Sequence, residues 1–430
     1  MKIIYVTTAL ALLSTLYATD IYTVDDLTLK ALKNSPELFI SSANYEASRS
    51  RYTLANANYR PTLDLLVSAG KNGQNNTFIN PDEIVSDSNI LGKLSVQQLI
   101  YDFGKTSSNS DNFKYDSQSF ANSYKQQISD KKQEVKSAYY HVLQNIALIK
   151  VNRENIKLNE AQLYRSQKYF DAGIRTKIDI SDAKVELIKS KLDLKKSQYD
   201  LKLSYAELDK VIGFKDIQND YKVYAKELDL ENLYNSLSKY DLGLQNAIEF
   251  AYLNRYEIKK QIANINASKA QSEVASSQYY PSLYFNADYT KQHVDTFKTF
   301  VPKNKWQASL NLNWNIYQGG ATDASTQEKK IQVEIAQSNL QYSKLLIKTQ
   351  TTQAYLNVYK AKDSVELSQS LLKVSNEKFH QASQRYEHGL SDFIELQQAR
   401  QGYIDAMTSL VVDYYSYYNS IAILDNAIGK

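Results

Sequence analysis

Cysteine is absent from the 430-residue sequence, and proline and glycine are scarce, with 5 and 12 residues respectively. Without cysteine, the chain has no disulfides, no thiolate nucleophile, and no cysteine-ligated zinc or iron–sulfur cluster. Because proline and glycine are the residues that most often interrupt regular structure, their scarcity predicts long uninterrupted helices or strands.

Long apolar runs and an excess of one charge are also missing. The mean hydropathy is −0.49, which excludes a bundle of transmembrane helices, since each such helix needs an apolar run of roughly 20 residues. The 51 Lys and Arg residues nearly balance the 47 Asp and Glu residues, for a net charge of +4. A dedicated nucleic-acid-binding protein normally carries a larger basic excess, so we expect no nucleic-acid partner.

The N-terminal segment has the features of a secretory signal peptide. Lys2 precedes an apolar stretch, residues 3–18, that ends at the small residue Ala18. This stretch is short for a membrane span and typical of a segment that is cleaved on export. We therefore expect residues 1–18 to be removed and the mature chain to function outside the cytoplasm.

The sequence contains one pattern twice. A shift of 216 residues superimposes residues 101–213 on the C-terminal part without a gap, and nearer the N-terminus the shift becomes 220. Matched positions include Tyr101 and Tyr317, Gly104 and Gly320, Gly173 and Gly389, and Pro61 and Pro281. Because internal repeats determine architecture, we expect two structural repeats, 19–213 and 244–430, joined by a connector over 214–243.

Each repeat is predicted to contain a helix, two strands, a long helix and a final helix. The first repeat has predicted helices at 25–58, 105–170 and 178–212 and strands at 62–71 and 91–102. The second has predicted helices at 244–278, 321–386 and 392–427 and strands at 282–291 and 305–317. The fold class is therefore mainly α with a small β part.

The long helices carry an apolar residue at every seventh position. In 105–170 these are Ile128, Val135, Val142, Ile149, Ile156, Leu163 and Phe170. Such a sustained repeat keeps one apolar stripe against a neighbouring helix, as in a coiled coil. A helix of this length extends roughly 100 Å, far more than the thickness of a bilayer, so we expect these helices to project away from any membrane.

The predicted strands alternate apolar and polar residues. From Trp306 to Ile316 every even position is apolar and every odd position is polar. The apolar positions of the other strands are Leu63, Leu65, Val67 and Ala69, then Leu94, Val96 and Ile100, then Leu283, Phe285, Ala287 and Tyr289. This alternation is typical of strands that cross a membrane as part of a barrel, although an ordinary soluble sheet with one wet face is the alternative.

Four strands are too few to close such a barrel. About eight strands are the practical minimum, and in lipid only a closed barrel satisfies the backbone groups at strand edges. The chain is therefore expected to oligomerise, and three copies would supply twelve strands.

The sequence shows no constellation of catalytic residues. The four histidines, His141, His293, His380 and His388, belong to no metal-binding motif. Neither a phosphate-binding glycine loop nor a Gly-x-Ser-x-Gly motif is present. We therefore expect no enzyme activity, no cofactor and no metal site.

Taken together, these features resemble the TolC-type outer-membrane efflux protein family. The resemblance is carried by Asn34-Ser35-Pro36-Glu37-Leu38, Tyr59-Arg60-Pro61, Tyr101-Asp102-Phe103-Gly104, Tyr317-Gln318-Gly319-Gly320 and Arg385-Tyr386-Glu387-His388-Gly389. It implies a homotrimer whose twelve-stranded β-barrel lies in outer-membrane lipid and continues into an α-helical barrel in the periplasm. It also implies an exit duct for efflux or type I secretion, docked to a periplasmic adaptor (membrane fusion protein) and an inner-membrane transporter of the resistance–nodulation–division (RND) or ABC type.

The resemblance further implies a narrow gate at the turns that join the helices of each pair. The residues expected at the gate or in the lumen are Arg175, Asp179, Asp182, Tyr386, Asp392, Glu395 and Gln398. The turn residues expected to contact the adaptor are Gly173, Ile174, Gly389, Leu390 and Ser391. Ser391 replaces a basic residue that latches the turn in some members, and Arg175 is a candidate to supply that cation instead.

Two alternatives remain open. The acids at the turns are also explained by helix capping, because Thr176 with Asp179 and Asp392 with Glu395 have the spacing of a capping box. For the whole chain the alternative is a secreted coiled-coil scaffold or adhesin without channel activity. That reading accounts for the sevenfold repeats but not for four alternating segments at matching places in two repeats.

Overall fold

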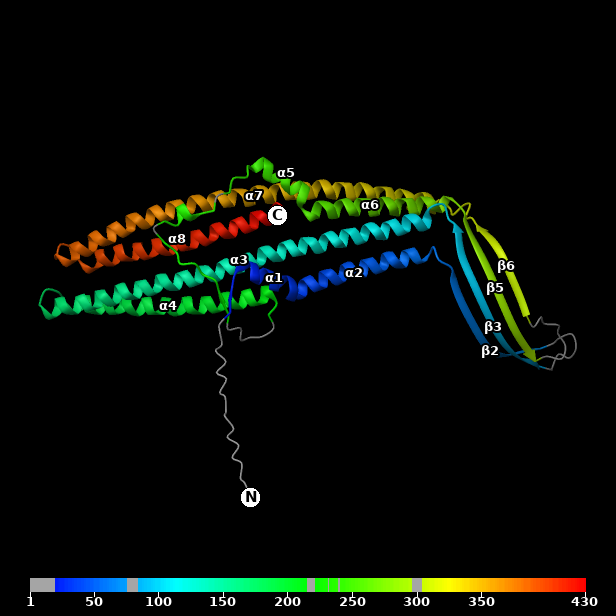
Figure 1. Cartoon of the computed structure of the whole chain (residues 1–430), viewed down its shortest axis with the longest axis horizontal. Coiled ribbons are helices and arrows are strands. Elements are labelled where there is room, and N and C mark those ends of the chain that lie inside the picture. Colours follow the sequence, from blue (N-terminus) through cyan, green and yellow to red (C-terminus); the bar gives the residue numbers. More distant parts are fainter. Residues whose placement is uncertain (1–19, 76–83, 215–220, 231, 239, 296–303) are drawn as a thin grey trace, which may run out of the picture.

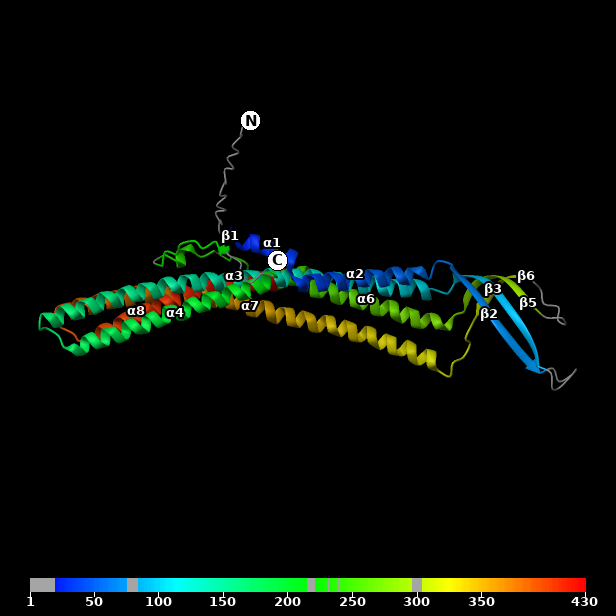
Figure 2. The same cartoon turned by 90° about the horizontal axis from the view of Figure 1, so that it is seen from below.

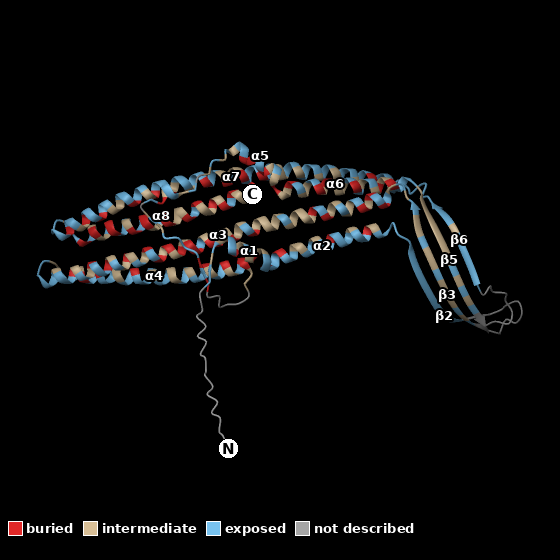
Figure 3. Cartoon of the chain, in the orientation of Figure 1, coloured by how far each residue is buried: buried red, intermediate tan, exposed pale blue. Residues whose placement is uncertain are grey.

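The computed structural model describes residues 20–75, 84–214, 221–230, 232–238, 240–295 and 304–430, so the predicted signal peptide lies outside the described residues. The molecule is elongated, with a long layer of helices and a sheet that extends from one end of it (Figures 1 and 2). Buried residues follow the helices, whereas the described residues of that sheet are exposed or half-buried (Figure 3).

The helices are α1 (Val24–Asn34), α2 (Pro36–Ala57), α3 (Lys105–Asp171), α4 (Lys177–Ile212), α5 (Leu244–Asn254), α6 (Tyr256–Ser276), α7 (Ala321–Glu387) and α8 (Phe393–Ala427), with short 3₁₀ turns η1 (Tyr234–Ser236) and η2 (Ser277–Tyr279). The strands are β1 (Asp20–Tyr22), β2 (Thr62–Asn75), β3 (Ile84–Tyr101), β4 (Tyr221–Val223), β5 (Ser282–Asp295) and β6 (Asn304–Asn313). The described chain is thus mainly helical with a small β part, and the order of helix, two strands, long helix and helix occurs twice. The expected fold class is confirmed in these respects.

The first predicted helix of each repeat is broken, which is a correction. Ser35 and Arg255 have extended backbone, with ψ of 119° and 132°. In the first repeat Pro36 disfavours helical geometry at the residue before it. In the second repeat the equivalent of Pro36 is Tyr256, and the Arg255 guanidinium donates instead to Gln350 at 2.7 Å and to Glu257.

The strands also differ from their predicted bounds. Pairing of β2 with β3 continues as far as Asn75 and Ile84, beyond the segment where alternation is visible, because ladder hydrogen bonds do not require an alternating sequence. At the other end, β6 stops at Asn313, four residues before the predicted end. The Trp314 indole N–H donates to the Tyr279 carbonyl at 3.1 Å, which holds the chain outside the ladder.

A small parallel sheet in the middle of the molecule was not predicted. In it, β1 pairs with β4, with Ile21 opposite Lys222. The connector, residues 214–243, therefore contributes a strand and η1. Each strand has three residues, which is too short to give a period in the sequence.

Equivalent glycines join each final helix to the N-terminal helices of its own repeat. Gly213 follows α4 with φ of 79°, and Gly429 follows α8 with φ of 78°. A Cβ at Gly213 would lie 2.8 Å from the carbonyl oxygen of Asn34, and one at Gly429 would lie 3.0 Å from the backbone nitrogen of Arg255. Both positions need glycine for its conformation and for its lack of a side chain.

We expect Gly213→Ala to lower the free energy of unfolding by about 1–3 kcal/mol, because left-handed backbone costs alanine roughly 1–2 kcal/mol and the Asn34 backbone must also move. Thermal unfolding followed by circular dichroism measures the effect as a lower Tm. Gly402→Ala is the matched control, since the added Cβ has no neighbour within 4 Å apart from the adjacent backbone of α8. Equal Tm values for the two variants would contradict the close approach.

The four-stranded sheet has the order β2-β3-β5-β6 with antiparallel pairing throughout. Its register separates two faces. One row across the sheet joins Leu65, Leu94, Tyr289 and Trp306, and the adjacent row joins Asp64, Ser95, Asp288 and Gln307. The sheet therefore has one apolar face and one polar face.

The apolar face is large and uncovered in the single chain. Its members are Leu63, Leu65, Val67, Ala69, Ile90, Leu94, Val96, Phe285, Ala287, Tyr289, Trp306, Ala308, Leu310 and Leu312. The exposed fraction is 73% for Leu65 and 78% for Trp306. Soluble monomers rarely expose a continuous apolar surface of this extent, and a strand face of this kind is suited to contact with lipid.

The helices lie side by side in the same order as the strands to which they connect. Near the sheet, α3 contacts α2 and α6, and α6 contacts α7; farther away, α3 contacts α4 and α8, and α8 contacts α7. One edge of the molecule is therefore formed by β2, α2 and α4, and the other by β6 and α7. No described helix is long and apolar enough to cross a membrane.

Candidate functional site

The two turns at the end of the molecule remote from the sheet are built alike. Gly173 and Gly389 adopt left-handed backbone, with φ of 71° and 73°. The N–H of Ile174 donates to the Tyr169 carbonyl, and the N–H of Leu390 donates to the Arg385 carbonyl, each at 2.8 Å. These bonds are those of a Schellman motif, which satisfies the last carbonyls of α3 and α7.

Arg175 joins the two turns. Its Nη2 donates to the carbonyl oxygen of Ser391 at 2.8 Å, and its guanidinium lies 4.7 Å from the centre of the Tyr386 ring. The contact with the ring is a cation–π interaction, which is stronger where the groups are shielded from water. We call Arg175, Tyr386 and Ser391 the tip latch.

The tip latch rests on a small apolar core. Tyr386 is only 1% exposed, and its ring lies 6.4 Å from that of Phe393 and 6.1 Å from that of Tyr169. Burial raises the pKa of the Tyr386 hydroxyl, the charge of Asp179 raises it further, and Arg175 opposes the shift. The phenol therefore stays neutral at physiological pH, and the ring presents an uncharged face to Arg175.

Only one of the two expected helix caps forms. The Asp392 carboxylate accepts from the N–H of Glu395 at 2.8 Å and caps α8. Thr176 makes no side-chain cap on α4, so that expectation is wrong. Its hydroxyl donates to the Asp179 carboxylate at 3.3 Å instead, and is thereby drawn away from the helix backbone.

The remaining expected residues lie outside the tip latch. The Glu395 carboxylate lies 3.5 Å from Nε of Arg385, next to the tip latch but outside it. Asp182 and Gln398 are exposed and are not drawn into the tip latch. Ile174 and Leu390 are 64% and 70% exposed and present apolar side chains at the ends of the turns.

Two ion pairs near the tip were not predicted. Arg165 of α3 lies 2.5 Å from Glu387 at the end of α7, and Arg400 of α8 lies 4.0 Å from Glu186 of α4. Arg400 is buried, and this burial lowers the pKa of its guanidinium while Glu186 opposes the shift. The partners lie in different repeats and far apart in sequence, so no local pattern could have found them.

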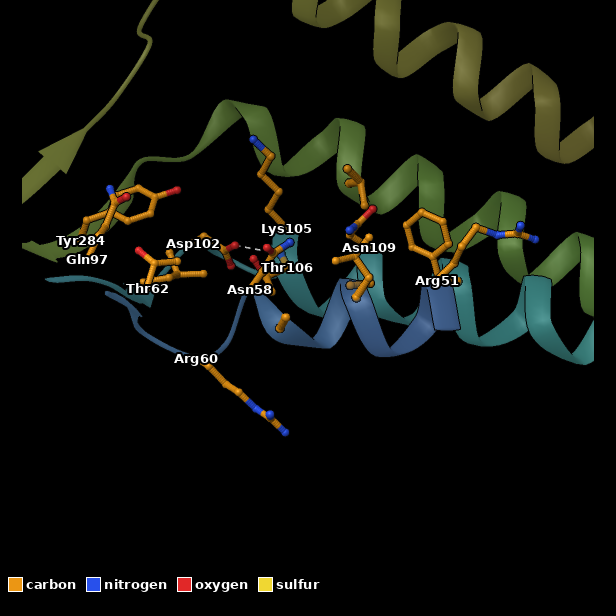
Figure 4. A pocket seen from close by; sticks show the side chains of 16 residues that line it. Arg51, Asn58, Arg60, Thr62, Gln97, Asp102, Lys105, Thr106, Asn109 and Tyr284 are labelled. Carbon is orange, nitrogen blue, oxygen red and sulfur yellow. Dashed lines mark hydrogen bonds between the residues drawn. The ribbon is translucent and has the colours of Figure 1, made fainter. Parts of the chain in front are cut away.

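A second candidate site is a hollow of about 820 Å³ where the sheet meets the helices. Thr62, Gln97 and Tyr284 place it on the polar face of the sheet. Its basic side chains, Arg51, Arg60 and Lys105, point in different directions (Figure 4), so they do not converge on one anion. The described residues also contain no group of three or more His, Asp or Glu able to hold a metal ion.

Comparison with known proteins identifies the family. A family model described as outer membrane efflux protein matches residues 27–214 and 247–430. Outer membrane protein TolC from Escherichia coli (strain K12) is 26% identical over 198 residues, which cover 46% of this chain and 40% of TolC. The match thus spans about two-fifths of the length of that curated relative.

Solved structures share the fold. CusC superposes with a TM-score of 0.84 at 16% identity, covering 94% of this chain and 92% of that chain. The CmeC outer membrane channel of Campylobacter jejuni superposes with a TM-score of 0.80 at 16% identity, covering 94% of this chain and 85% of that chain. The open state of the MtrE outer membrane channel of Neisseria gonorrhoeae superposes with a TM-score of 0.77 at 15% identity, covering 94% of this chain and 88% of that chain. Because the family model matches both repeats, the chain belongs to the outer membrane efflux protein family and is an outer-membrane protein.

Proposed function

We propose that the protein is the exit duct of a tripartite efflux or type I secretion system. Substrates would pass through it without energy input, from a periplasmic adaptor and an inner-membrane transporter of the RND or ABC type to the exterior. The observation that carries this proposal is the exposed apolar face of the sheet, joined to helices of roughly 100 Å. A wall of this shape fits a lipid layer at one end and a wide aqueous space along the rest.

A homotrimer closes the duct. The sheet ends at β2 on one side and β6 on the other, and lipid cannot satisfy the backbone groups of those edges. In a cyclic assembly the β2 edge of one copy meets the β6 edge of the next. Three copies give a twelve-stranded barrel with its polar face toward the lumen.

The helix turns form the periplasmic gate. The tip latch ties the α3–α4 turn to the α7–α8 turn within each copy, which supports a closed resting state. Asp179, Asp182, Glu395 and Gln398 line the lumen near this point. The exposed side chains of Ile174 and Leu390, beside Gly173, Gly389 and Ser391, supply an apolar surface for the adaptor.

We expect the double variant Asp179→Asn/Glu395→Gln to lower the cation preference of the channel, because acids in a narrow lumen concentrate cations. The measurement is the reversal potential of the purified protein in planar bilayers under a salt gradient. Glu227→Gln, on the exposed connector, is the matched control. An unchanged reversal potential in the double variant would remove these acids from the lumen.

Planar-bilayer recording also tests the function itself. The purified wild-type protein is expected to insert and to give stepwise conductance. A secreted coiled-coil scaffold or adhesin, the alternative function, would give no steps and would be extracted from membranes by salt alone. The apolar face of the sheet favours the duct, because a secreted scaffold in water would not leave so large an apolar surface exposed.

A further inference from the structure

Two side-chain hydrogen bonds fix the register of α3 against α8. Ser129 donates to Asn426 at 2.7 Å, and Ser137 donates to Asn419 at 2.6 Å. As residue numbers rise along α3 toward the tip, the numbers of the residues they meet on α8 fall by nearly the same amount. The two helices are antiparallel neighbours with a defined pairing.

The internal repeat transfers this pairing to the two edges of the molecule. With the shift of 216 residues, α7 is the equivalent of α3 and α4 is the equivalent of α8. Yet α4 and α7 lie at opposite edges of the same chain. In a cyclic assembly, the α7 edge of one copy meets the α4 edge of the next, in the register that α3 and α8 already show.

Exposed apolar side chains mark both edges. On α4 they are Ile188, Leu192, Tyr199 and Leu203, and on α7 they are Leu356, Leu367 and Val374. On each helix the buried residues pack against its partner within the chain, and at 100° per residue these exposed residues lie on the opposite face. The edge of α7 therefore carries the same kind of stripe that α3 turns toward α8.

At one position, the side chains of the α3–α8 contact within the chain and those of the α7–α4 contact between copies differ in chemistry. Within the chain, Ala147 of α3 and Met407 and Val411 of α8 line one hollow, which the connector residues Leu228 and Leu230 also line. The equivalent residues, 216 positions away, are Asp363 of α7 and Lys191 and Lys195 of α4. Three apolar residues inside the chain are thus replaced by one acid and two lysines at the edges.

We propose that Asp363 of one copy binds between Lys191 and Lys195 of the next copy, and that this contact recognises a second copy of the chain and fixes its register. The inference rests on the proposed trimer and adds the residues that select the partner. All three side chains are exposed in the single chain. The Lys191 ammonium has an exposed partner, the Glu160 carboxylate at 3.8 Å, so it is able to turn toward a new one.

Charge also explains why the edges of one copy do not pair with themselves. Two α4 edges would bring lysines together, whereas α4 against α7 brings lysines to an acid. Like charges in contact suppress wrong partners, and opposite charges set the register. The contact therefore favours a closed ring over a symmetric dimer of equal edges.

Disulfide trapping tests the position directly, because the chain contains no cysteine. The full-length protein carrying Asp363→Cys and Lys191→Cys is oxidised in membranes with copper phenanthroline and run on a non-reducing denaturing gel. Covalent dimers and trimers are expected, because Asp363 and Lys191 are the equivalents of Ala147 and Met407. Each single-cysteine variant is the control and should give no covalent trimer.

A second control uses the equivalent contact inside the chain. Ala147→Cys with Met407→Cys should form its disulfide within one chain and give only covalent monomer. Absence of covalent oligomers in the Asp363→Cys/Lys191→Cys protein, while native mass spectrometry still finds three chains, would overturn this inference and leave the proposed duct standing. A single chain by mass would overturn both.

Charge reversal tests the recognition. Asp363→Lys alone, and Lys191→Glu with Lys195→Glu, should each lower the temperature at which the trimer dissociates in dodecyl sulfate. All three substitutions together should recover most of that loss, because the opposite charges are restored with their positions exchanged. A combined variant that loses as much as the two sets added would show that the charges do not meet.

Discussion

Arg175→Ala should open the tip of the duct and raise its single-channel conductance in planar bilayers several-fold. The substitution removes the hydrogen bond to the Ser391 carbonyl and the cation above the Tyr386 ring. A hydrogen bond from a charged donor and a partly shielded cation–π contact together contribute about 2–4 kcal/mol. Because each of the three copies would lose this stabilisation, the closed tip is strongly disfavoured in the variant.

Two further variants make this result specific. Lys177→Ala removes an exposed cation two residues away and is expected to leave conductance unchanged. Arg175→Lys keeps the charge but loses the planar fork of the guanidinium, so an intermediate conductance is expected. A closed channel in Arg175→Ala, with conductance equal to that of Lys177→Ala, would show that the tip latch does not hold the gate.

Leu94→Arg should abolish assembly in the outer membrane, whereas Ser95→Arg should permit it. The two residues are neighbours on β3, but Leu94 lies in the apolar row and Ser95 lies opposite Asp64 and Asp288 in the polar row. An arginine on the lipid face near the bilayer midplane costs about 2–4 kcal/mol, and three copies would bear it together. In the lumen the same arginine meets two acids.

The measurement for this pair is the amount of heat-modifiable trimer in the outer-membrane fraction. We expect it to disappear for Leu94→Arg and to remain for Ser95→Arg. If both variants assembled equally well, the apolar face would not contact lipid. If both variants failed to assemble, the polar face would not be in contact with water.

Much of the fold could be predicted because its signals are local and repeated. The alternation around Trp306 and around Leu283 identified strands, and the sevenfold repeat through Val135 and Val142 identified a long helix. The shift of 216 residues related the two halves to each other. What the pattern lacked was the break at Arg255, where contacts with Glu257 and Gln350 decide the backbone, and those contacts have no sequence signature.

For the candidate site, the sequence predicted the two turns but not the contacts between them. Glycine at 173 and 389 indicated the two turns, and Arg175 could be named as a candidate cation. That Arg175 binds the carbonyl of Ser391, the residue equivalent to it in the other repeat, could not be read from the sequence. Thr176 shows the same limit, because capping-box spacing predicted a bond to the backbone while a nearby carboxylate competes for the hydroxyl.

The number of chains per particle tests most directly whether four strands from each copy close a common wall. Native mass spectrometry of the detergent-solubilised mature protein should find three chains, because neither sheet edge can remain unpaired in lipid. A particle of one chain that stays in solution without detergent would contradict the barrel, the gate and the duct together.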